Sequence, residues 1–127
     1  MSDGRPHWVL IVLKHAGFRN TVQHVLTGDP HFEIVAAVGS GEEALAISQQ
    51  RELDLVLLEI RLPGMSGLKT ATLIKAGRPQ TIILLLSGDW SPAYERLARA
   101  SGITARLAKQ TFSLTNLYRA LENSSSV

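Results

Sequence analysis

Four polar side chains stand at the ends of apolar, strand-length stretches of this sequence, where their chemistry could be used together. They are Lys14, Glu59, Ser87 and Lys109. If the stretches form one parallel sheet, their carboxyl ends lie at one edge, which is where open α/β sheets bind ligands. Ammonium and hydroxyl groups attract anions, whereas a carboxylate pairs with a cation. We therefore expect a small, charged site at that edge, built around the single carboxylate of Glu59.

Five apolar runs, each followed by a helix-like segment, position these residues. The runs are residues 8–13, 33–38, 54–58, 81–86 and 103–108. Ser40, Ser66 and Ser91 stand where helix N-caps belong, and Pro92 suits a first helical position. Alternation of this kind predicts right-handed βαβ units, hence an α/β fold with one doubly wound, five-stranded parallel sheet.

Composition bounds the class of protein. The chain has 127 residues, with 45% hydrophobic and 19% charged, which fits one globular domain. We expect that domain to span residues 1–123 and residues 124–127 to be a polar tail or the start of a linker. With no cysteine, disulfide and thiolate chemistry are excluded, and a net charge of +2 does not indicate a nucleic-acid binder. The N-terminus lacks a signal-peptide core and no run is long enough to span a membrane, so a cytoplasmic location is expected.

The segment from Leu53 to Gly67 resembles the core of response-regulator receiver domains, the modules of two-component phosphorelay signalling. In that family an aliphatic strand ends on a phospho-accepting Asp, followed by x-x-x-Pro-Gly-x-x-Gly. Here the acceptor position holds Glu59, followed by Pro63 and Gly64. The resemblance extends from about residue 8 to 122, and it implies a flavodoxin-like (βα)5 fold with strand order 2-1-3-4-5.

The resemblance also implies roles for residues at the strand ends, and several depart from the family pattern. The equivalents are Leu13 and Lys14 for the acidic pair that holds Mg²⁺, Glu59 for the phospho-acceptor, Ser87 and Arg106 for the two switch positions, and Lys109 for the phosphate-pairing lysine. One carboxylate beside two lysines is a poor ligand set for Mg²⁺, which prefers several hard oxygens. We expect no metal, no cofactor and no enzymatic activity.

Two hypotheses describe what Glu59 does in such a site. In the first, Lys14 replaces the charge of the metal while Glu59 reaches towards Ser87 and Lys109, as a permanent partial mimic of a phosphorylated Asp. In the second, the site has decayed and Glu59 simply pairs with a nearby lysine. Both predict an atypical receiver that works without phosphorylation.

Receivers contact partners through a face that corresponds here to the helix after Pro92, the strand 103–108 and the last helix; we call it the output face. The candidate interface residues are Tyr94, Arg96, Arg99, Arg106 and Tyr118. Their charge favours an acidic protein partner or a second copy in a homodimer. Contact with DNA would come only through a separate effector module, and no membrane partner is expected.

The leading prediction is a phosphorylation-independent receiver that serves signalling or transcription regulation as an interaction module. One alternative is a ligand-sensing receiver that binds a small anion or metabolite between Lys14, Lys109 and Ser87. Another is a weakly phosphorylatable, conventional receiver. Basic arginines that bind nucleic acid are a further alternative, which a steep salt dependence of binding would reveal.

Overall fold

The computed structural model describes residues 4–101, 103 and 105–125. Five parallel strands form one sheet in the order β2-β1-β3-β4-β5, so the predicted topology is confirmed. The strands are β1 (His7–Val12), β2 (Phe32–Val38), β3 (Leu55–Glu59), β4 (Ile82–Ser87) and β5 (Ala105–Ala108).

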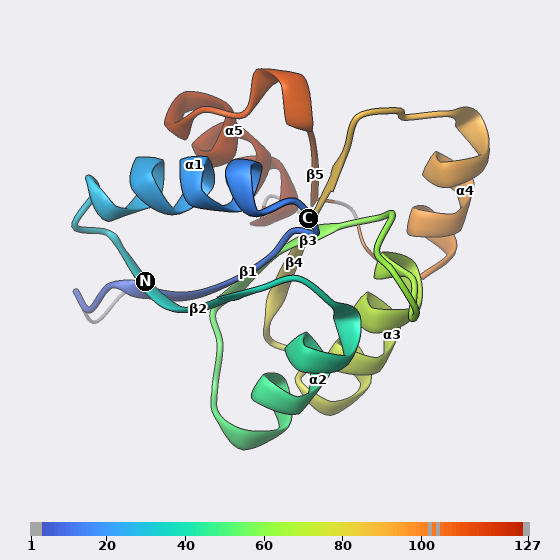
Figure 1. Ribbon diagram of the computed structural model, residues 1–127, viewed down its shortest axis with the longest axis horizontal. Coiled ribbons are helices and arrows are strands. Elements are labelled where there is room, and N and C mark those ends of the chain that lie inside the picture. The colour runs from blue at the N-terminus through green and yellow to red at the C-terminus, as the bar shows by residue number, and fades with distance from the viewer. Residues whose placement is uncertain (1–3, 102, 104, 126–127) are drawn as a thin grey trace.

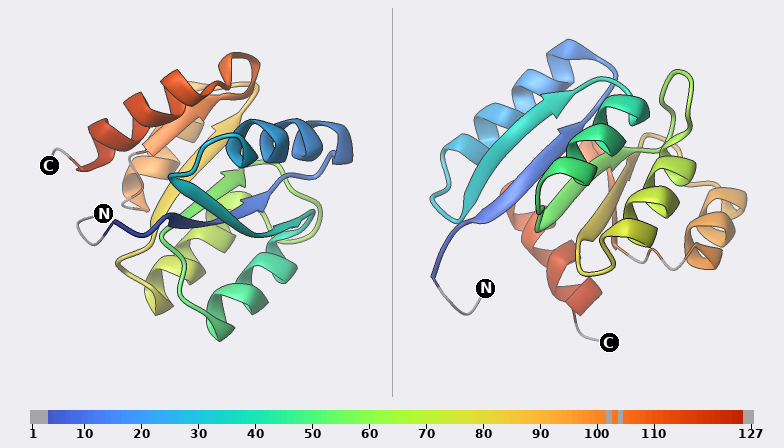
Figure 2. Two further views of the ribbon diagram at one scale, coloured as in Figure 1. Left: turned by 90° about the vertical axis from the view of Figure 1, so that its left-hand side faces the viewer. Right: turned by 90° about the horizontal axis from the view of Figure 1, so that it is seen from below.

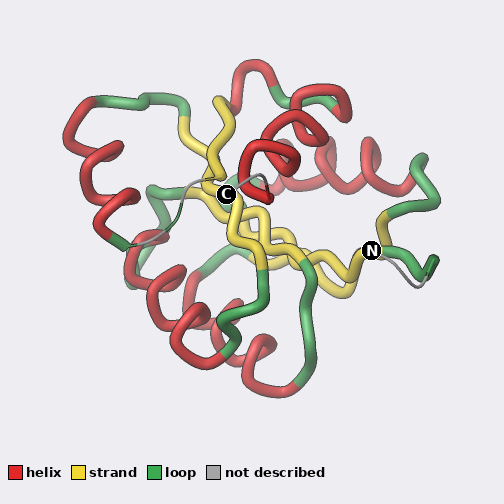
Figure 3. The backbone as a smooth tube through the Cα atoms, turned by 180° about the vertical axis from the view of Figure 1, so that it is seen from behind, coloured by secondary structure: helices red, strands yellow, loops and turns green. Residues whose placement is uncertain are grey.

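Helices cover both faces of this sheet (Figure 1). They are α1 (Ala16–Thr27), α2 (Gly41–Gln50), α3 (Gly67–Gly77), α4 (Pro92–Ala100) and α5 (Leu114–Ser125), with a 3-10 turn, η1, at Lys109–Thr111. Seen from behind, the sheet runs through the middle of the molecule with helices on either side (Figure 3). The start of β1 and the end of α5 lie on the same side of the molecule (Figure 2).

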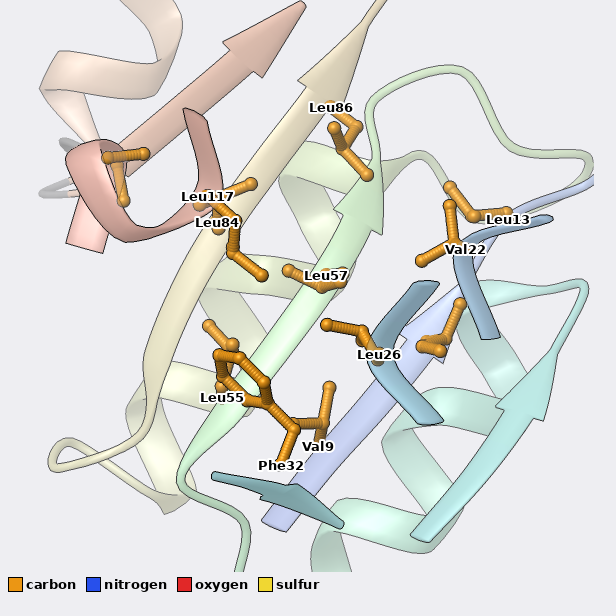
Figure 4. Close-up of a cluster of buried hydrophobic side chains, with 13 residues drawn as sticks. Val9, Leu13, Val22, Leu26, Phe32, Leu55, Leu57, Leu84, Leu86 and Leu117 are labelled. Atoms are coloured by element: carbon orange, nitrogen blue, oxygen red, sulfur yellow. The ribbon is translucent and has the colours of Figure 1, made fainter. Parts of the chain in front are cut away.

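Alternate side chains of the central strands fill two separate cores. On β1, Val9 and Ile11 pack towards α1 and α5, whereas Leu10 and Val12 pack towards α2 and α3. Figure 4 shows the first core, in which Leu57 of β3 lies among leucines and valines from the neighbouring strands and helices. Burial on both faces explains why these strands read as continuous apolar runs rather than as alternating ones.

The predicted N-caps are confirmed. The hydroxyl oxygens of Ser40, Ser66 and Ser91 each accept a hydrogen bond from the backbone N–H three residues on, and Pro92 is the first residue of α4. A capping oxygen satisfies one of the free N–H groups of a first helical turn. These serines therefore fix where three of the five helices begin after their strands.

Boundaries differ from the expected ones by only a few residues. Ser87 belongs to β4 itself, and β5 begins at Ala105 rather than at residue 103. Helix α5 continues to Ser125, two residues beyond the expected domain end at 123. The remaining tail, residues 126–127, lies outside the described residues, as do residues 1–3 of the expected domain. Among the described residues, no helix is long and apolar enough to cross a membrane.

A tight turn connects β3 to α3 directly behind the site. The N–H of Gly67 donates to the carbonyl oxygen of Ile60 at 2.8 Å. A Cβ at Gly67 would overlap the carbonyl oxygen of Glu59 and the backbone of Ile60, so only glycine fits. Gly64 has φ +70, a left-handed conformation that side chains disfavour. The two glycines therefore let the chain turn sharply after Glu59.

Candidate functional site

The carboxyl ends of β1, β3, β4 and β5 enclose a polar pocket of about 220 Å³. It is lined by Lys14, His15, Glu59, Arg61, Ser87, Gly88, Asp89 and Lys109. The four polar residues expected at the strand ends are thus all present. His15, the N-cap residue of α1, also lines the pocket, although its side chain makes no capping hydrogen bond.

Glu59 lines the pocket, and each oxygen of its carboxylate has a hydrogen-bond partner. Its exposed fraction is 4%. One oxygen, Oε1, accepts a hydrogen bond from the backbone N–H of Lys14 at 2.9 Å. The other, Oε2, pairs with Nζ of Lys109 at 2.7 Å. A charge-assisted bond and an amide bond together hold a nearly buried carboxylate in one position.

Lys109 is held on two sides. Lys109 directly follows β5. Its ammonium group pairs with Glu59 and also lies 5.3 Å from the ring centroid of Phe18 on α1. Its side chain is 23% exposed, so water reaches it only in part. The ion pair with Glu59 therefore connects β3 with β5 and lies against α1.

Lys14 approaches Glu59 through a different atom from the one expected. Its backbone N–H makes the hydrogen bond, while the residue as a whole is exposed. Among the described residues, the Lys14 ammonium forms no ion pair with Glu59 or with another carboxylate. The hypothesis that this ammonium replaces the charge of the metal at Glu59 thus needs correction, because the group that meets the carboxylate is an amide.

Leu13 lies in the hydrophobic core rather than in the pocket. It is fully buried, and Figure 4 shows it beside Val22 of α1. A side chain in that place contributes packing and offers no ligand atom.

Ser87 is buried, and its hydroxyl bonds to the backbone of Asp89 rather than to Glu59. Its hydroxyl donates to the carbonyl oxygen of Asp89 at 2.9 Å and accepts from the N–H of Asp89 at 3.0 Å. The hydroxyl therefore closes a local turn at the start of the loop between β4 and α4. Glu59 does not bond to it, contrary to the reach proposed from the sequence.

Two further charged side chains line the pocket, and sequence reasoning missed their pairing. Arg61 and Asp89 form an ion pair with 3.7 Å between the nitrogen and the oxygen. Both are mostly exposed, at 61% and 68%. Each is an isolated loop residue, so no spacing in the sequence indicated that they would meet across two strands.

The expected interface residues occupy two separate places. Arg96 and Arg99 are exposed on α4, Tyr94 is half-buried, and Arg106 pairs with Glu95 at 2.6 Å. Tyr118 instead packs on Phe32, with ring centroids 5.5 Å apart, away from these four. It lies on α5 against the loop between α1 and β2, so its part in a partner surface stays a prediction.

The Tyr118 hydroxyl donates to the Asp29 carboxylate at 2.6 Å, and His31 donates its backbone N–H to the same carboxylate at 2.8 Å. The bond from Tyr118, then that from His31, holds the pKa of Asp29 below its usual 3.8. Partial burial, followed by the bond to Asp29, raises the pKa of Tyr118 to about 12. The cluster therefore fastens α5 to the loop before β2.

Comparison with known proteins identifies the family. Residues 9–122 match the sequence profile of the response regulator receiver domain. The chain belongs to the response-regulator receiver family. Receiver domains are signalling modules of two-component systems, so the family expected from the motif around Glu59 is confirmed.

Two curated relatives are similar in sequence to this chain. The nitrate/nitrite response regulator protein NarP of Escherichia coli is 35% identical over 92 residues, which cover 72% of this chain and 43% of NarP. The transcriptional regulatory protein PdtaR of Mycobacterium tuberculosis is 32% identical over 117 residues, covering 92% of this chain and 56% of PdtaR. The chain thus spans about half the length of these relatives.

A solved receiver has the same fold. The signal receiver domain of the response regulator NarL from Mycobacterium tuberculosis superposes with a TM-score of 0.86, at 24% identity, over 97% of this chain and 99% of that one. At this identity the likeness concerns the fold alone.

The Mg²⁺ that serves conventional receivers does not fit the residues of this one. The acidic-pair positions hold the buried Leu13 and the amide-donating Lys14, and both oxygens of Glu59 already have partners. Among the described residues, no group of three or more His, Cys, Asp or Glu side chains could hold a metal ion. Three cationic side chains besides two carboxylates line the pocket, so the donor set favours an anion over a divalent cation.

Proposed function

We propose that this receiver acts without phosphorylation, as a protein-interaction module of two-component signalling. One observation carries the proposal: both oxygens of Glu59 are occupied, by the Lys14 amide and by the Lys109 ammonium. A carboxylate in that state is a poor nucleophile towards a phosphoryl donor. Phosphoryl transfer also relies on metal and cation clamps that offset developing charge, and the metal does not fit here.

The Glu59–Lys109 pair supports a receiver that stays in one state. The pair connects β3 to β5 without any signal, so a single conformation is held permanently. A decayed site in which the same pair has no effect beyond its own surroundings is the alternative. Pairs near solvent contribute only ~0–1 kcal/mol, but removing one partner of a nearly buried pair costs more, because the other charge is left without compensation.

The variant Glu59→Gln separates a locked receiver from a decayed site. It keeps an oxygen for the Lys14 amide but removes the charge that Lys109 pairs with. In a locked receiver, backbone amide shifts change across β5 and α4 as well as around residue 59. Shift changes confined to the immediate neighbours of residue 59 would favour the decayed site.

Incubation with a small-molecule phosphoryl donor and Mg²⁺ tests the proposal directly. Intact-mass spectrometry should show no stable phosphoryl adduct on the wild-type chain, while a phosphorylatable receiver in the same buffer gains one. The double variant Lys14→Asp, Glu59→Asp places Asp at one acidic-pair position and at the acceptor position without disturbing the core at Leu13. A wild-type adduct that disappears in Glu59→Gln would overturn the proposal and revive the weakly phosphorylatable alternative.

Anion sensing is the second candidate function, and the exposed Lys14 ammonium favours it. That group lines the pocket together with Arg61 and has no carboxylate partner among the described residues. Calorimetric titration with inorganic phosphate tests this function. Saturable binding in the wild type that weakens in Lys14→Ala would support an anion sensor. Absence of binding heat would argue against it, and the interaction module would then be the one proposed function.

The partner surface is proposed to be the output face formed by α4, β5 and α5, through which a protein or a second copy would bind. Exposed Arg96 and Arg99 support an acidic partner, while the charge of Arg106 is already paired with Glu95. NarP and PdtaR are both named as regulators and extend well beyond the region matched here. DNA contact is accordingly proposed only for a separate effector module.

A further inference from the structure

Helix α4 buries fewer of its residues than α1, α2 or α3, the other helices whose buried residues are described in full. Of its nine residues only Ala98 is buried, whereas α3 buries four of its residues. Leu97 is 53% exposed, the highest value among the large apolar residues that the structure shows exposed. Figure 1 shows α4 at the right-hand edge of the molecule, above α3. Something other than a buried apolar stripe must therefore help to hold this helix in place.

Arg61 supplies one such contact, from the loop that follows Glu59. Its guanidinium carbon lies 5.3 Å from the ring centroid of Tyr94, in the first turn of α4. The same guanidinium pairs with Asp89, in the loop that leads into the helix. Arg61 thus connects the end of β3 with the start of α4.

Arg106 supplies the matching contact from β5. It pairs with Glu95 of α4 at 2.6 Å, and its guanidinium carbon lies 5.7 Å from the ring centroid of Trp90. The Trp90 indole N–H in turn donates to the carbonyl oxygen of Leu107 at 3.4 Å. The two aromatic residues therefore lie just before α4 and within it, and the two cations come from β5 and from the loop after β3.

We propose that Arg61 and Arg106 form a pair of clamps that sets the position of α4, each through one ion pair and one cation–π contact. Arginine suits this role because its planar guanidinium both pairs with a carboxylate and stacks on an aromatic ring. The clamps lie near solvent, so salt weakens them, and the mobility of α4 follows ionic strength. The proposal concerns α4 and stands whether or not Glu59 accepts a phosphoryl group.

Hydrogen exchange of the α4 amides tests the clamps. Arg61→Ala and Arg106→Ala should each speed exchange across α4, by up to about fivefold for the loss of an exposed contact of typical strength. The double variant should show the larger effect, while β3 and β4 exchange as in the wild type. High salt should speed α4 exchange in the wild type and change it little in the double variant.

Arg96→Ala is the matched control, because Arg96 is an exposed arginine of α4 with no partner among the described residues. Its α4 exchange should stay at the wild-type rate. A double clamp variant whose α4 amides exchange like those of Arg96→Ala would overturn the proposal.

A fluorescence measurement gives a second readout that does not depend on exchange. The chain has two tryptophans, so Trp8→Phe leaves Trp90 as the only indole. In that background, adding Arg106→Ala should lower the fluorescence anisotropy of Trp90, because the ring loses the guanidinium above it. Unchanged anisotropy would contradict the part of the proposal that concerns Arg106.

Discussion

At the scale of single residues, the site depends on which atom of each side chain faces Glu59. From the sequence, Glu59 and Lys109 were expected at the carboxyl ends of two strands, and the structure brings their side chains to 2.7 Å across the intervening strand β4. It could not show that Lys14 would offer its amide instead of its ammonium. That choice depends on the backbone direction after β1 and not on residue type.

Removing the charge of Glu59 should destabilise the fold. Glu59→Gln keeps an acceptor for the Lys14 amide but leaves the Lys109 ammonium, which is 23% exposed, without its carboxylate. We expect a loss of about 1–3 kcal/mol in the free energy of unfolding, measured by urea denaturation. Glu33→Gln, at an exposed position on β2, is the control and should change stability by less than about 0.5 kcal/mol.

The two lysines of the pocket should behave very differently when truncated. Lys14→Ala keeps the backbone N–H on Glu59, so the change in stability should stay within about 0.5 kcal/mol. Lys109→Ala leaves a nearly buried carboxylate without its ion-pair partner and should lower the free energy of unfolding by about 1–3 kcal/mol. Equal losses in the two variants would show that the Lys14 ammonium does pair with Glu59 in solution.

At the scale of elements, the β3–α3 connection depends on a glycine that touches backbone. Gly67→Ala would push a Cβ into the carbonyl oxygen of Glu59 and the backbone of Ile60. Such overpacking should cost about 1–3 kcal/mol in thermal or chemical unfolding and shift the amide signal of residue 59. Gly77→Ala is the control, since no atom lies within 4 Å of its Cβ, and it should be neutral or stabilising.

The attachment of α5 to the α1–β2 loop should depend on pH. Tyr118→Phe removes the hydroxyl that bonds to Asp29 at 2.6 Å, and should cost about 1 kcal/mol near neutral pH. The pKa of Asp29 is lowered from 3.8, so its contribution is present above that pH and is lost as the pH falls through the folded-state pKa. The difference between wild type and variant should therefore shrink in acid.

For Tyr118, the sequence predicted the helix but not the contact partner. Its helix could be predicted from apolar spacing, yet its partner Asp29 lies 89 residues away in the chain. Which side of α5 the ring occupies depends on how α5 packs beside α1, which no local pattern specifies. Local signals such as the serine caps were predictable because donor and acceptor are only three residues apart.

At the scale of the whole molecule, the fold was predictable and the function only in outline. Continuous apolar runs with helix signals between them require a parallel sheet, and the order 2-1-3-4-5 came from the resemblance to receivers. A fold does not determine function by itself, so whether this receiver takes a phosphoryl group depends on the few residues at the strand ends. Those residues form one cationic pocket around an occupied carboxylate.

The central claim is that Glu59 and its neighbours form a receiver site that does not take Mg²⁺ or a phosphoryl group. Titration with Mg²⁺ and beryllofluoride, a phosphoryl mimic, while backbone amide shifts are followed at Glu59, Ser87 and Lys109, tests it most directly. No shift at millimolar metal is the predicted result. Saturable shifts at these three residues would contradict it and would show that the Glu59–Lys109 pair opens to admit the metal and the phosphoryl mimic.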